Sequence, residues 1–506
     1  MPTSVHYRPD PRFEALGAEF ADPAAPAAFP AWTLRFRNDR AATSVGLDAL
    51  TPQEWAAAFC RFEPLPDNQA QPLAMRYHGH QFRTYNPQLG DGRGFLFAQL
   101  REAGTSRLLD LGTKGSGRTP YSRFGDGRLT LKGGVREVLA SEMLEALGVP
   151  TCRTFSLFET GEDLMRPDEP SPTRSSVMTR LSHSHIRFGT FQRHAHARRP
   201  DLVQVLIDHV VQVYYPDLLP LEGEARTAGL LEAVVGRSAT LVARWMAAGF
   251  VHGVLNTDNM NITGESFDYG PYRFLPYNDL GFTAAYFDET GLYAFGRQPE
   301  AMFWNLQQLA AALASVCGPG PLVEALNGFG AAYQDALAAA LLARLGLQSR
   351  GEPEDAALAG LAFRAIAEAG PGLRWEPFFF DWFGGSASEA RALNGVRGDL
   401  YGGEAFSAFR AALKGFAAEA QGRLEQAYFQ QPEPEELLYD EIEALWAPIA
   451  ERDDWSAFEA KLARIGQAGR AWGLGFGRPI GGHEDRDAGI DRGVDLGVGR
   501  HGADVP

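Results

Sequence analysis

Short apolar runs separated by glycine-rich turns give the first half of the chain the pattern of a small sheet. Residues 95–100 (FLFAQL) and 107–114 (RLLDLGTK) are apolar runs of strand length bounded by glycines. Residues 152–158 and 175–181 have the same character and are joined by a polar loop. Between these pairs, residues 135–144 repeat apolar side chains at a spacing of about 3.6, which is typical of a helix. We therefore predict a small sheet with one helix, an arrangement that can form a lid over a nucleotide.

Helical spacing replaces this pattern in the rest of the chain. Apolar residues recur at helical intervals over residues 201–250, and Ala/Leu-rich helical stretches follow at 300–345, 354–370 and 404–470. The longest Ala/Leu run, residues 336–343, is far shorter than the roughly 20 apolar residues of a membrane-spanning helix. It predicts a buried helix.

The composition is that of a large globular chain. Of 506 residues, 45% are hydrophobic and 22% are charged, which excludes a disordered chain or a fibre. The formal charge is −16, from 47 Lys and Arg against 63 Asp and Glu, so a dedicated nucleic-acid binder is disfavoured. Cys60, Cys152 and Cys317 lie far apart, which argues against a disulfide framework and a structural zinc site. The N-terminus shows no apolar targeting segment, so we predict a cytoplasmic protein. From the acidic charge and the short apolar runs, we predict that it binds neither nucleic acid nor a membrane.

Positive charge is nevertheless concentrated in two short windows. Residues 111–136 carry six cations against one acid, Asp126, and residues 174–200 carry six arginines and no acid. The cations are Lys114, Arg118, Arg123, Arg128, Lys132, Arg136, Arg174, Arg180, Arg187, Arg193, Arg198 and Arg199. This concentration in an acidic chain indicates a site for a compact anion. Two alternatives stay open. The cations could lie on solvent-exposed faces, or they could reflect a general preference for arginine, since only four residues of the chain are lysine.

One polar segment carries the spacing of a kinase catalytic loop. In protein kinases an Asn seven residues after a His binds magnesium, and a downstream Asp-Phe-Gly supplies a carboxylate ligand. Here Asn259 follows His252 by seven residues, and Asp268 begins an Asp-Tyr-Gly sequence. The position of the kinase base holds Val254, whereas Asp258 places a new carboxylate beside Asn259. If this spacing stood alone, the alternative would be that residues 256–259 form an ordinary turn rich in Asn and Asp.

Residues upstream complete a phosphate-binding set in the order that a kinase uses. Lys114 ends a predicted strand and Glu137 lies on the next predicted helix, as in the lysine–glutamate pair that positions phosphates. Arg180 and Arg187 add two planar guanidinium groups suited to phosphate. Each of these residues alone could be an incidental charge. Their order along the chain, followed by the Asp-Asn and Asp-Tyr-Gly motifs, predicts a nucleotide site with a divalent metal.

Longer stretches of the chain resemble a known family. The sequence is similar to the selenoprotein O family from about Tyr77 to Leu309. The matching segments are 77–82 (YHGHQF), 88–93 (QLGDGR), 119–123 (TPYSR), 125–128 (GDGR), 184–189 (SHIRFG), 253–260 (GVLNTDNM) and 268–271 (DYGP). These segments are far more specific than a single glycine pattern.

The resemblance implies an α+β, protein-kinase-like fold with two lobes and the activity of a protein adenylyltransferase. ATP is expected to bind inverted relative to an ordinary kinase, so that AMP passes to a Ser, Thr or Tyr hydroxyl of a protein and pyrophosphate leaves. The implied metal is Mg²⁺, with Mn²⁺ as an alternative, and self-modification is a further possibility. By motif, the resemblance assigns five residues to nucleotide binding: Gly90, Gly92, Arg93, Asp126 and Gly127. It assigns phosphate binding to Lys114, Arg180 and Arg187, and the orientation of Lys114 to Glu137. Asn259 and Asp268 are expected to bind the metal, and Asp258 is expected to accept the hydroxyl proton.

The chain then divides into five expected segments. They are an N-terminal extension (1–75), a kinase-like N-lobe (76–195), a C-lobe with the catalytic loop (196–345), a C-terminal helical region (346–476) and a tail expected to be disordered (477–506).

Two departures from the family pattern bear on this expectation. Arg83 and Thr84 follow Phe82 where many relatives have glycine, so this turn is expected to differ. The C-terminal third fits the family poorly and has no cysteine after Cys317, so redox control through a C-terminal thiol is not expected. Two other functions stay open: phosphoryl transfer with Asp258 as a displaced base, and an inactive, nucleotide-binding pseudokinase scaffold.

Overall fold

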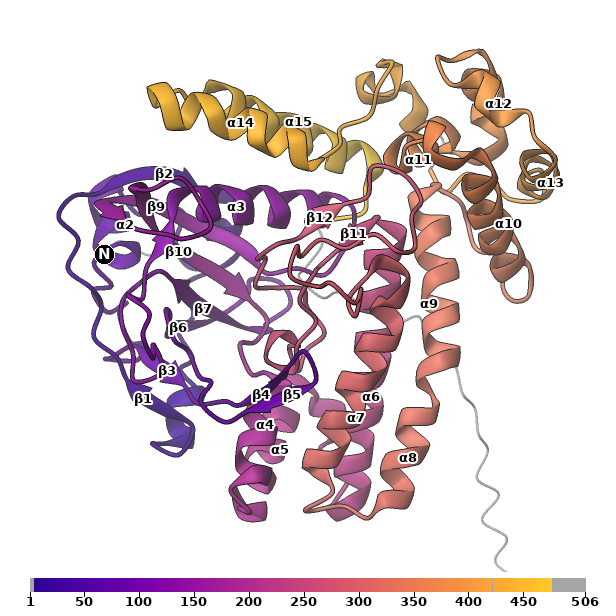
Figure 1. Cartoon of the computed structure of the whole chain (residues 1–506). Coiled ribbons are helices and arrows are strands. Elements are labelled where there is room, and N and C mark those ends of the chain that lie inside the picture. The colour runs from indigo at the N-terminus through magenta and orange to yellow at the C-terminus, as the bar shows by residue number, and fades with distance from the viewer. Residues whose placement is uncertain (1–3, 421, 476–506) are drawn as a thin grey trace, which may run out of the picture.

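An antiparallel sheet forms one side of the molecule. The computed structural model describes residues 4–420 and 422–475. Its main sheet has eight strands in the order β1-β3-β6-β7-β10-β9-β2, with β8 paired to β10, and all pairs are antiparallel (Figure 1). The strands are β1 (Ala21–Pro23), β2 (Thr33–Arg37), β3 (Leu73–Met75), β6 (Leu96–Arg101), β7 (Leu108–Lys114), β8 (Leu129–Thr130), β9 (Arg153–Leu164) and β10 (Thr173–Ser182). The four predicted strands are confirmed as β6, β7, β9 and β10.

The N-terminal residues are part of this sheet. Strands β1, β2 and β3 all come from the first 75 residues, and β3 pairs with β6. Helices α1 (Asp39–Ser44) and α2 (Pro52–Phe59) fill the connection between β2 and β3. The expected boundary at residue 75 is therefore not a boundary of the sheet, since strands on both sides of it share one hydrogen-bonded ladder.

The register of β7 and β10 brings two predicted phosphate-binding residues to one face of the sheet. Lys114 is paired with Met178, and Arg180 is paired with Gly112. Directly paired residues and residues two apart on a strand share a face, so Lys114 and Arg180 project to the same side. The His185 ring packs directly on Gly112, because a Cβ atom at residue 112 would lie 2.3 Å from that ring.

Helix α3 (Leu131–Ala146) packs on the sheet and confirms the helix predicted at residues 135–144. Its N-terminus is capped by Thr130, whose side chain accepts a hydrogen bond from the Gly133 N–H at 3.1 Å. Gly134 permits close packing on the sheet, since a Cβ atom there would lie 2.5 Å from Leu157. The helix thereby holds Glu137 in a buried position.

The helices predicted over residues 201–250 and 300–345 form a second layer beside the sheet (Figure 1). They are α5 (Pro200–Tyr214), α6 (Gly223–Ala247), α7 (Gln298–Leu313), α8 (Pro319–Asn327) and α9 (Phe329–Arg344), with α4 (Phe188–His196) before them. The run 336–343 lies in α9 and is partly buried, with Leu341 and Leu342 in the core. None of the helices in the described part of the chain is both long and apolar enough to cross a membrane.

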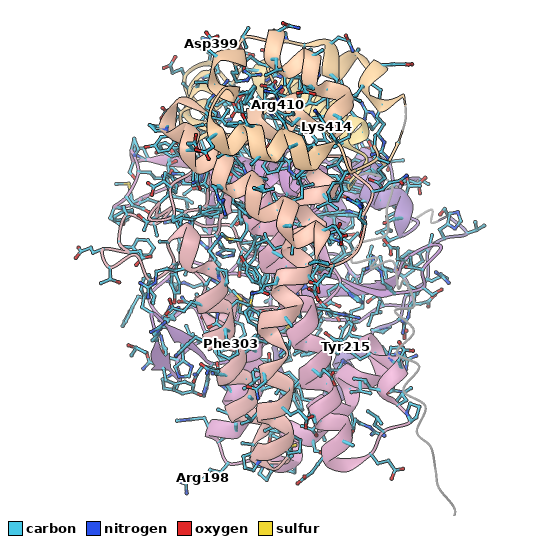
Figure 2. All side chains as sticks on the ribbon, turned by 90° about the vertical axis from the view of Figure 1, so that its right-hand side faces the viewer. Arg198, Tyr215, Phe303, Asp399, Arg410 and Lys414 are labelled. Atoms are coloured by element: carbon cyan, nitrogen blue, oxygen red, sulfur yellow. The ribbon has the colours of Figure 1, made fainter. Side chains whose placement is uncertain are left out.

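The C-terminal region is helical, as its spacing predicts, and ends by packing on α3. It contains α10 (Glu354–Ala369), α11 (Trp375–Trp382), α12 (Glu389–Asn394), α13 (Glu404–Leu413), α14 (Tyr439–Arg452) and α15 (Ser456–Trp472). Figure 2 shows Asp399, Arg410 and Lys414 of this region at the opposite end of the molecule from Arg198. Helices α14 and α15 run along α3 (Figure 1), and Lys132 of α3 forms an ion pair with Glu443 of α14 at 2.7 Å. The expected disordered tail, 477–506, lies outside the described residues.

Candidate active site

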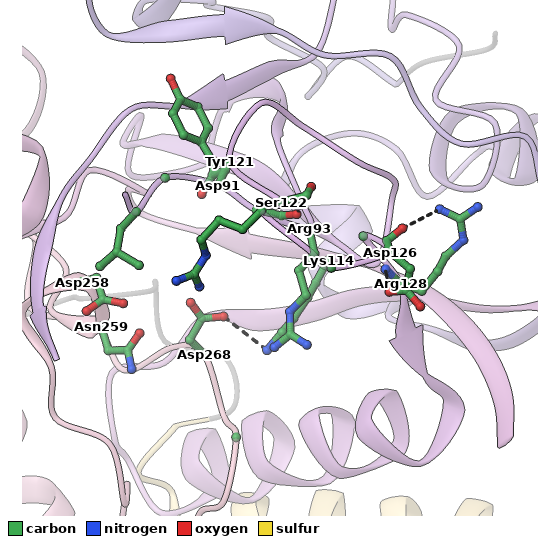
Figure 3. Close-up of a pocket in the computed structure, with 18 of the residues that line it drawn as sticks. Asp91, Arg93, Lys114, Tyr121, Ser122, Asp126, Arg128, Asp258, Asn259 and Asp268 are labelled. Atoms are coloured by element: carbon green, nitrogen blue, oxygen red, sulfur yellow. Dashed lines mark hydrogen bonds and ion pairs between the residues drawn. The ribbon is translucent and has the colours of Figure 1, made fainter. Parts of the chain in front are cut away.

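One cavity collects the residues predicted for the site. It has a volume of about 740 Å³ and lies between the sheet and the loops that precede α7 (Figure 3). Eleven of the twelve predicted residues line it: Gly90, Gly92, Arg93, Lys114, Asp126, Gly127, Arg180, Arg187, Asp258, Asn259 and Asp268. The twelfth, Glu137, lies behind the wall and contacts Lys114. Residues far apart in the sequence therefore share one site.

Lys114 is placed by the end of β7 and by a buried ion pair. Its ammonium group donates a short hydrogen bond to the Glu137 carboxylate on α3, and both side chains are almost fully buried. The same ammonium group lies 3.3 Å from Oδ1 of Asp268. Lys114 thus links the sheet, α3 and the Asp-Tyr-Gly segment. Its contact with Glu137 is the ion pair that the sequence predicts.

Asp268 is surrounded by three cations. Arg180 Nη1 donates to its Oδ1 at 2.6 Å, Arg187 Nη1 donates to its Oδ2 at 3.0 Å, and Lys114 completes the set. Burial alone would raise the pKa of Asp268, but these positive charges hold it well below its usual range. The backbone of Asp268 has φ +62°, a left-handed conformation that is uncommon outside glycine and typical of functional positions. The carboxylate is therefore ionised and fixed in orientation.

Asp258 is a second carboxylate in the cavity with a different environment. It follows the turn that begins at Asn256, in the short 3₁₀ helix η3 (Thr257–Asn259), and only 8% of its surface is exposed. Its Oδ1 atom is buried and has no hydrogen-bond partner among the described residues. Burial raises the pKa of Asp258 to about 6, against the opposing charge of Arg187. A carboxylate that lines the cavity and has a pKa of about 6 is suited to accept a proton.

Asn259 presents an oxygen to the cavity. Its Nδ2 donates to the Val254 carbonyl at 2.9 Å, so Oδ1 is left as an acceptor. Together with the Asp268 carboxylate, this is a hard, all-oxygen donor pair of the kind that Mg²⁺ takes. Among the described residues no group of three or more His, Cys, Asp or Glu side chains could hold a metal ion. A metal at this pair would therefore complete its shell with nucleotide phosphates and water.

Hydrogen bonds hold the loop that carries Asp258 and Asn259. The buried His252 Nε2 lies 3.0 Å from the Phe267 carbonyl, one residue before Asp268, and its Nδ1 lies 3.4 Å from the Val254 N–H. This pattern requires the proton on Nε2, and burial lowers the pKa of His252, so the ring is neutral. Asn305 of α7 donates to the Leu255 carbonyl at 2.8 Å from below the loop. His252 therefore ties the two predicted motifs together.

A hairpin supports the other side of this loop. Strands β4 (Gly79–Gln81) and β5 (Thr84–Asn86) are joined by Phe82 and Arg83, which both have positive φ. This is the turn conformation that glycine favours, and it falls at the position where the sequence departs from the family pattern. The His80 N–H donates to Thr257 and the Phe82 N–H donates to Asn256. Gly79 backs Asp258 directly, since a Cβ atom there would lie 3.0 Å from the Asp258 side chain.

Several residues of the cavity were not predicted. Asp91 accepts a hydrogen bond from the Met75 N–H at 3.0 Å and lies 3.5 Å from Arg187, and burial raises its pKa. Asp91 lies inside the segment 88–93 that resembles the family, and this position could have indicated its place in the site. Asp126 is paired with Arg166 at 2.8 Å, a partner from the β9–β10 loop that sequence spacing did not indicate.

The two ends of the cavity differ in character. The closed end holds Lys114, Arg180 and Arg187, each about 4% exposed. The open end is lined by Phe124, which is fully exposed, and Met165, which is 71% exposed. Figure 3 shows Asp258 and Asn259 on one side of Lys114 and Asp268, with Asp126 and Arg128 on the other. Three buried cations therefore line one part of the cavity, whereas the exposed part is lined by Phe124 and Met165 together with the exposed Arg93 and Arg123.

Comparison with known proteins identifies the family. Residues 3–466 match the family described as protein adenylyltransferase SelO. The chain is 45% identical over 472 residues to the protein nucleotidyltransferase YdiU of Synechocystis sp., which covers 90% of this chain and 97% of that protein. It is 46% identical over 481 residues to the protein of the same name from Gloeobacter violaceus, covering 91% and 97% of the two chains. A third relative of that name, from Synechococcus elongatus, is 54% identical over 342 residues, which is 67% of this chain and 68% of that protein.

These matches correct the expected extent of the resemblance. The similarity is not confined to the segment from Tyr77 to Leu309, and the C-terminal third is not foreign to the family, because the family match reaches residue 466. The N-terminal strands and the C-terminal helices that pack on α3 are therefore parts of the shared architecture. The chain belongs to the SelO family of protein adenylyltransferases.

Proposed function

We propose that this protein has a kinase-like, two-lobed fold and transfers AMP from Mg-ATP to Ser, Thr or Tyr hydroxyls of other proteins through the cavity described above. ATP as the nucleotide and a protein as the acceptor follow from the family. One observation carries the assignment of the site: Lys114, Arg180 and Arg187 converge on Asp268 in the cavity that also holds Asp258 and Asn259.

The proposed lobes follow the layers of the fold. The N-lobe is the sheet with α3, and it includes strands from residues 1–75 as well as residues 76–195. The C-lobe is the helical layer of residues 196–345 with the catalytic loop, and residues 346–476 form a helical extension. The order lysine, glutamate, catalytic loop and Asp-Tyr-Gly along these layers matches that of protein kinases.

Phosphate binding is assigned to the buried cations. Guanidinium groups present paired donors to phosphate oxygens, and an ammonium group supplies a compact charge. Asn259 Oδ1 and the Asp268 carboxylate would hold Mg²⁺, and a divalent ion at this place neutralises charge on the triphosphate. Catalysis of this kind consists mostly of positioning and charge stabilisation, which the rigid ion-pair network around Asp268 provides.

The inverted orientation of the nucleotide is part of this proposal and comes from the resemblance to the family. Lys114, Arg180 and Arg187 are buried in the cavity, and Phe124 and Met165 line its exposed part together with Arg93 and Arg123. In this orientation the β- and γ-phosphates would contact Lys114, Arg180 and Arg187, and the α-phosphate, rather than the γ-phosphate, would face Asp258 and Asn259. Gly90 and Gly92 line the cavity and pack directly on Tyr121, where a Cβ atom would lie only 2.3 Å and 3.0 Å from it.

Asp258 is assigned as the proton acceptor. The acceptor hydroxyl oxygen forms a bond to the α-phosphorus, its proton passes to the Asp258 carboxylate, and the bond from the α-phosphorus to the bridging oxygen breaks to release pyrophosphate. The position of Asp258 in the cavity lining and its pKa of about 6 support this role. The position that holds the base in protein kinases is Val254 here and cannot serve. A cytoplasmic location is part of the proposal, in keeping with three free, buried cysteines.

Intact-mass measurement after incubation with ATP and Mg²⁺ tests the proposed reaction. The protein and a set of purified acceptor proteins are expected to gain the mass of one or more adenylates in the wild type and none in Asp258→Asn. A gain of phosphate mass would instead support phosphoryl transfer. Saturable ATP binding with no mass gain on any protein, including the enzyme itself, would support a pseudokinase scaffold.

A further inference from the structure

An apolar patch is exposed on the segment between β12 (Arg273–Phe274) and α7. It consists of Leu280, Tyr286 and Phe287, which are 61%, 84% and 46% exposed. Large apolar side chains that gather on a surface commonly mark a site of interaction with another protein. We call these three residues the 280–287 patch.

The patch borders a recess with an acidic rim. The recess has a volume of about 520 Å³, a size that accepts a large side chain, and Leu280 and Tyr286 line it together with Glu289 and Arg297. Arg297 pairs with Glu300 at 3.2 Å, and Glu300 also pairs with Arg83 at 3.1 Å. Glu289 is exposed and forms no ion pair or hydrogen bond among the described residues. The recess is lined by two carboxylates, Asp288 and Glu289, against one cation, Arg297, so negative charge predominates there.

The segment that bears the patch is held in place by its own hydrogen bonds. Asp288 is buried, and its carboxylate accepts hydrogen bonds from the Leu292 and Tyr293 N–H groups at 2.8 Å. The Phe295 N–H donates to the Phe282 carbonyl, and the Gly296 N–H donates to the Leu280 carbonyl, both at 2.9 Å. Exposure of the patch is thus imposed by an ordered loop.

The patch lies directly beside the loop that carries Asp258. The Phe287 ring contacts the Phe82 ring at 5.8 Å between centroids, and the Phe82 N–H donates to Asn256 Oδ1. Tyr293 donates to the same Asn256 oxygen at 2.8 Å. Gly253 faces this segment, since a Cβ atom there would lie 3.0 Å from Ala284. The patch is therefore connected to the loop that carries Asp258 through Phe82 at the turn of the β4–β5 hairpin.

We propose that the 280–287 patch and its recess bind the acceptor protein through a segment that carries a large apolar or aromatic residue and a Lys or Arg near the modified hydroxyl. The apolar side chain occupies the recess against Leu280 and Tyr286, and the basic residue faces Glu289. Aromatic residues and arginine are also those that interfaces favour. This inference rests on the proposed AMP transfer and adds its sequence preference.

A library of peptides with one central Ser, Thr or Tyr and randomised flanking positions tests the preference. The full-length enzyme is incubated with the library, ATP and Mg²⁺, and adenylylated peptides are sequenced by mass spectrometry. Enrichment of large apolar and basic flanking residues is the expected result. Modified peptides without that enrichment, or modification of intact proteins without modification of any peptide, would overturn the inference while leaving AMP transfer standing. Absence of AMP on every peptide and protein would contradict the proposed function itself.

Surface variants locate the preference on the structure. Leu280→Ala and Tyr286→Ala are expected to raise the KM for an enriched peptide at least tenfold, with little change in the KM for ATP. Leu219→Ala, at a residue that is 47% exposed elsewhere, is the matched control. Glu289→Lys is expected to lower kcat/KM for a peptide with a basic flank and to raise it for the same peptide with Glu in that place.

The same variants distinguish a second occupant. If the patch joins two copies of this chain, Tyr286→Ala reduces the molecular mass measured by analytical ultracentrifugation and leaves the peptide KM unchanged. That result would overturn the inference, as would an equal loss of kcat/KM for all peptides whatever their flanking residues.

Discussion

Arg180 donates a hydrogen bond to Asp268 at 2.6 Å and so joins the central strand β10 to the segment that follows the catalytic loop. Arg187 and Lys114 contact the same carboxylate. Three buried cations therefore share Asp268, with Glu137 and Asp91 at their periphery. A cluster of this kind binds anions strongly, because phosphate oxygens can take over cations that are already desolvated and oriented.

The first prediction concerns Asp268. Replacement by Asn removes the charge shared by Lys114, Arg180 and Arg187, so we expect AMP transfer to fall at least about 100-fold and the melting temperature to drop. Because phosphate can replace the lost charge, ATP without metal is expected to raise the melting temperature of Asp268→Asn more than that of the wild type. Differential scanning fluorimetry with and without ATP measures this, with Asp399→Asn as the exposed control. Equal shifts in the two proteins would contradict the shared-charge account.

The second prediction concerns the ion pair between Lys114 and Glu137. Lys114→Met leaves a buried Glu137 without its partner, which costs about 3–5 kcal/mol in the free energy of unfolding. Because Lys114 also faces the phosphates, kcat/KM for ATP is expected to fall at least about 100-fold. Lys414→Met, at an exposed lysine, should match the wild type in both measurements. Full activity in folded Lys114→Met would remove this residue from the site.

The third prediction concerns the pH dependence of AMP transfer. Asp258 accepts a proton only when ionised, and burial raises its pKa to about 6. The rate of transfer should therefore rise about tenfold per pH unit below pH 6 and level off above it. Asp258→Asn should lose about 100- to 10,000-fold in rate and lack this rise. Rates measured from pH 5 to 8 under saturating ATP test both statements, and an unchanged slope in Asp258→Asn would assign the titration to another group.

The fourth prediction concerns the contact between the C-terminal helices and the sheet. Asp453, just after α14, pairs with Arg174 at 2.6 Å and with Arg35 at 2.9 Å, and these interactions lower its pKa to about 2 although burial opposes them. The folded pKa is below the unfolded value, so the stabilisation is complete above about pH 4 and is lost as the pH falls toward 2. Because Asp453 is half exposed, Asp453→Asn should lower the free energy of unfolding by only about 1 kcal/mol at pH 7. Urea unfolding at pH 7 and pH 3 checks this, and an equal effect at both values would contradict the ion-pair explanation.

Local pattern was sufficient to predict part of this structure. Strands β6 and β7 and helix α3 were predicted to within a few residues, because each combines a continuous apolar pattern with clear end signals. The convergence of Lys114 with Asp268 was also predictable, since it follows from the order of kinase-like motifs. By contrast, β1 and β3 are three-residue strands without alternation, and only pairing with distant segments defines them.

Tertiary contacts account for the site features that the sequence did not reveal. Arg166 reaches Asp126 from a loop whose position depends on the β9–β10 hairpin. The raised pKa of Asp258 arises from burial under the β4–β5 hairpin, which no spacing rule encodes. The exposure of Tyr286 depends on the Asp288 turn. Long-range packing therefore sets the pKa values and ion-pair partners of the site residues, whereas local motifs indicate which residues belong to the site.

The most direct measurement of the central claim follows each phosphorus atom of ATP. The enzyme, Mg²⁺ and an acceptor protein are incubated in parallel with ATP labelled at the α- or the γ-phosphate, with Asp268→Asn as the negative control. The account predicts that label from the α-phosphate enters protein, that label from the γ-phosphate leaves with pyrophosphate, and that the variant transfers neither. Retention of label from the γ-phosphate alone would contradict it.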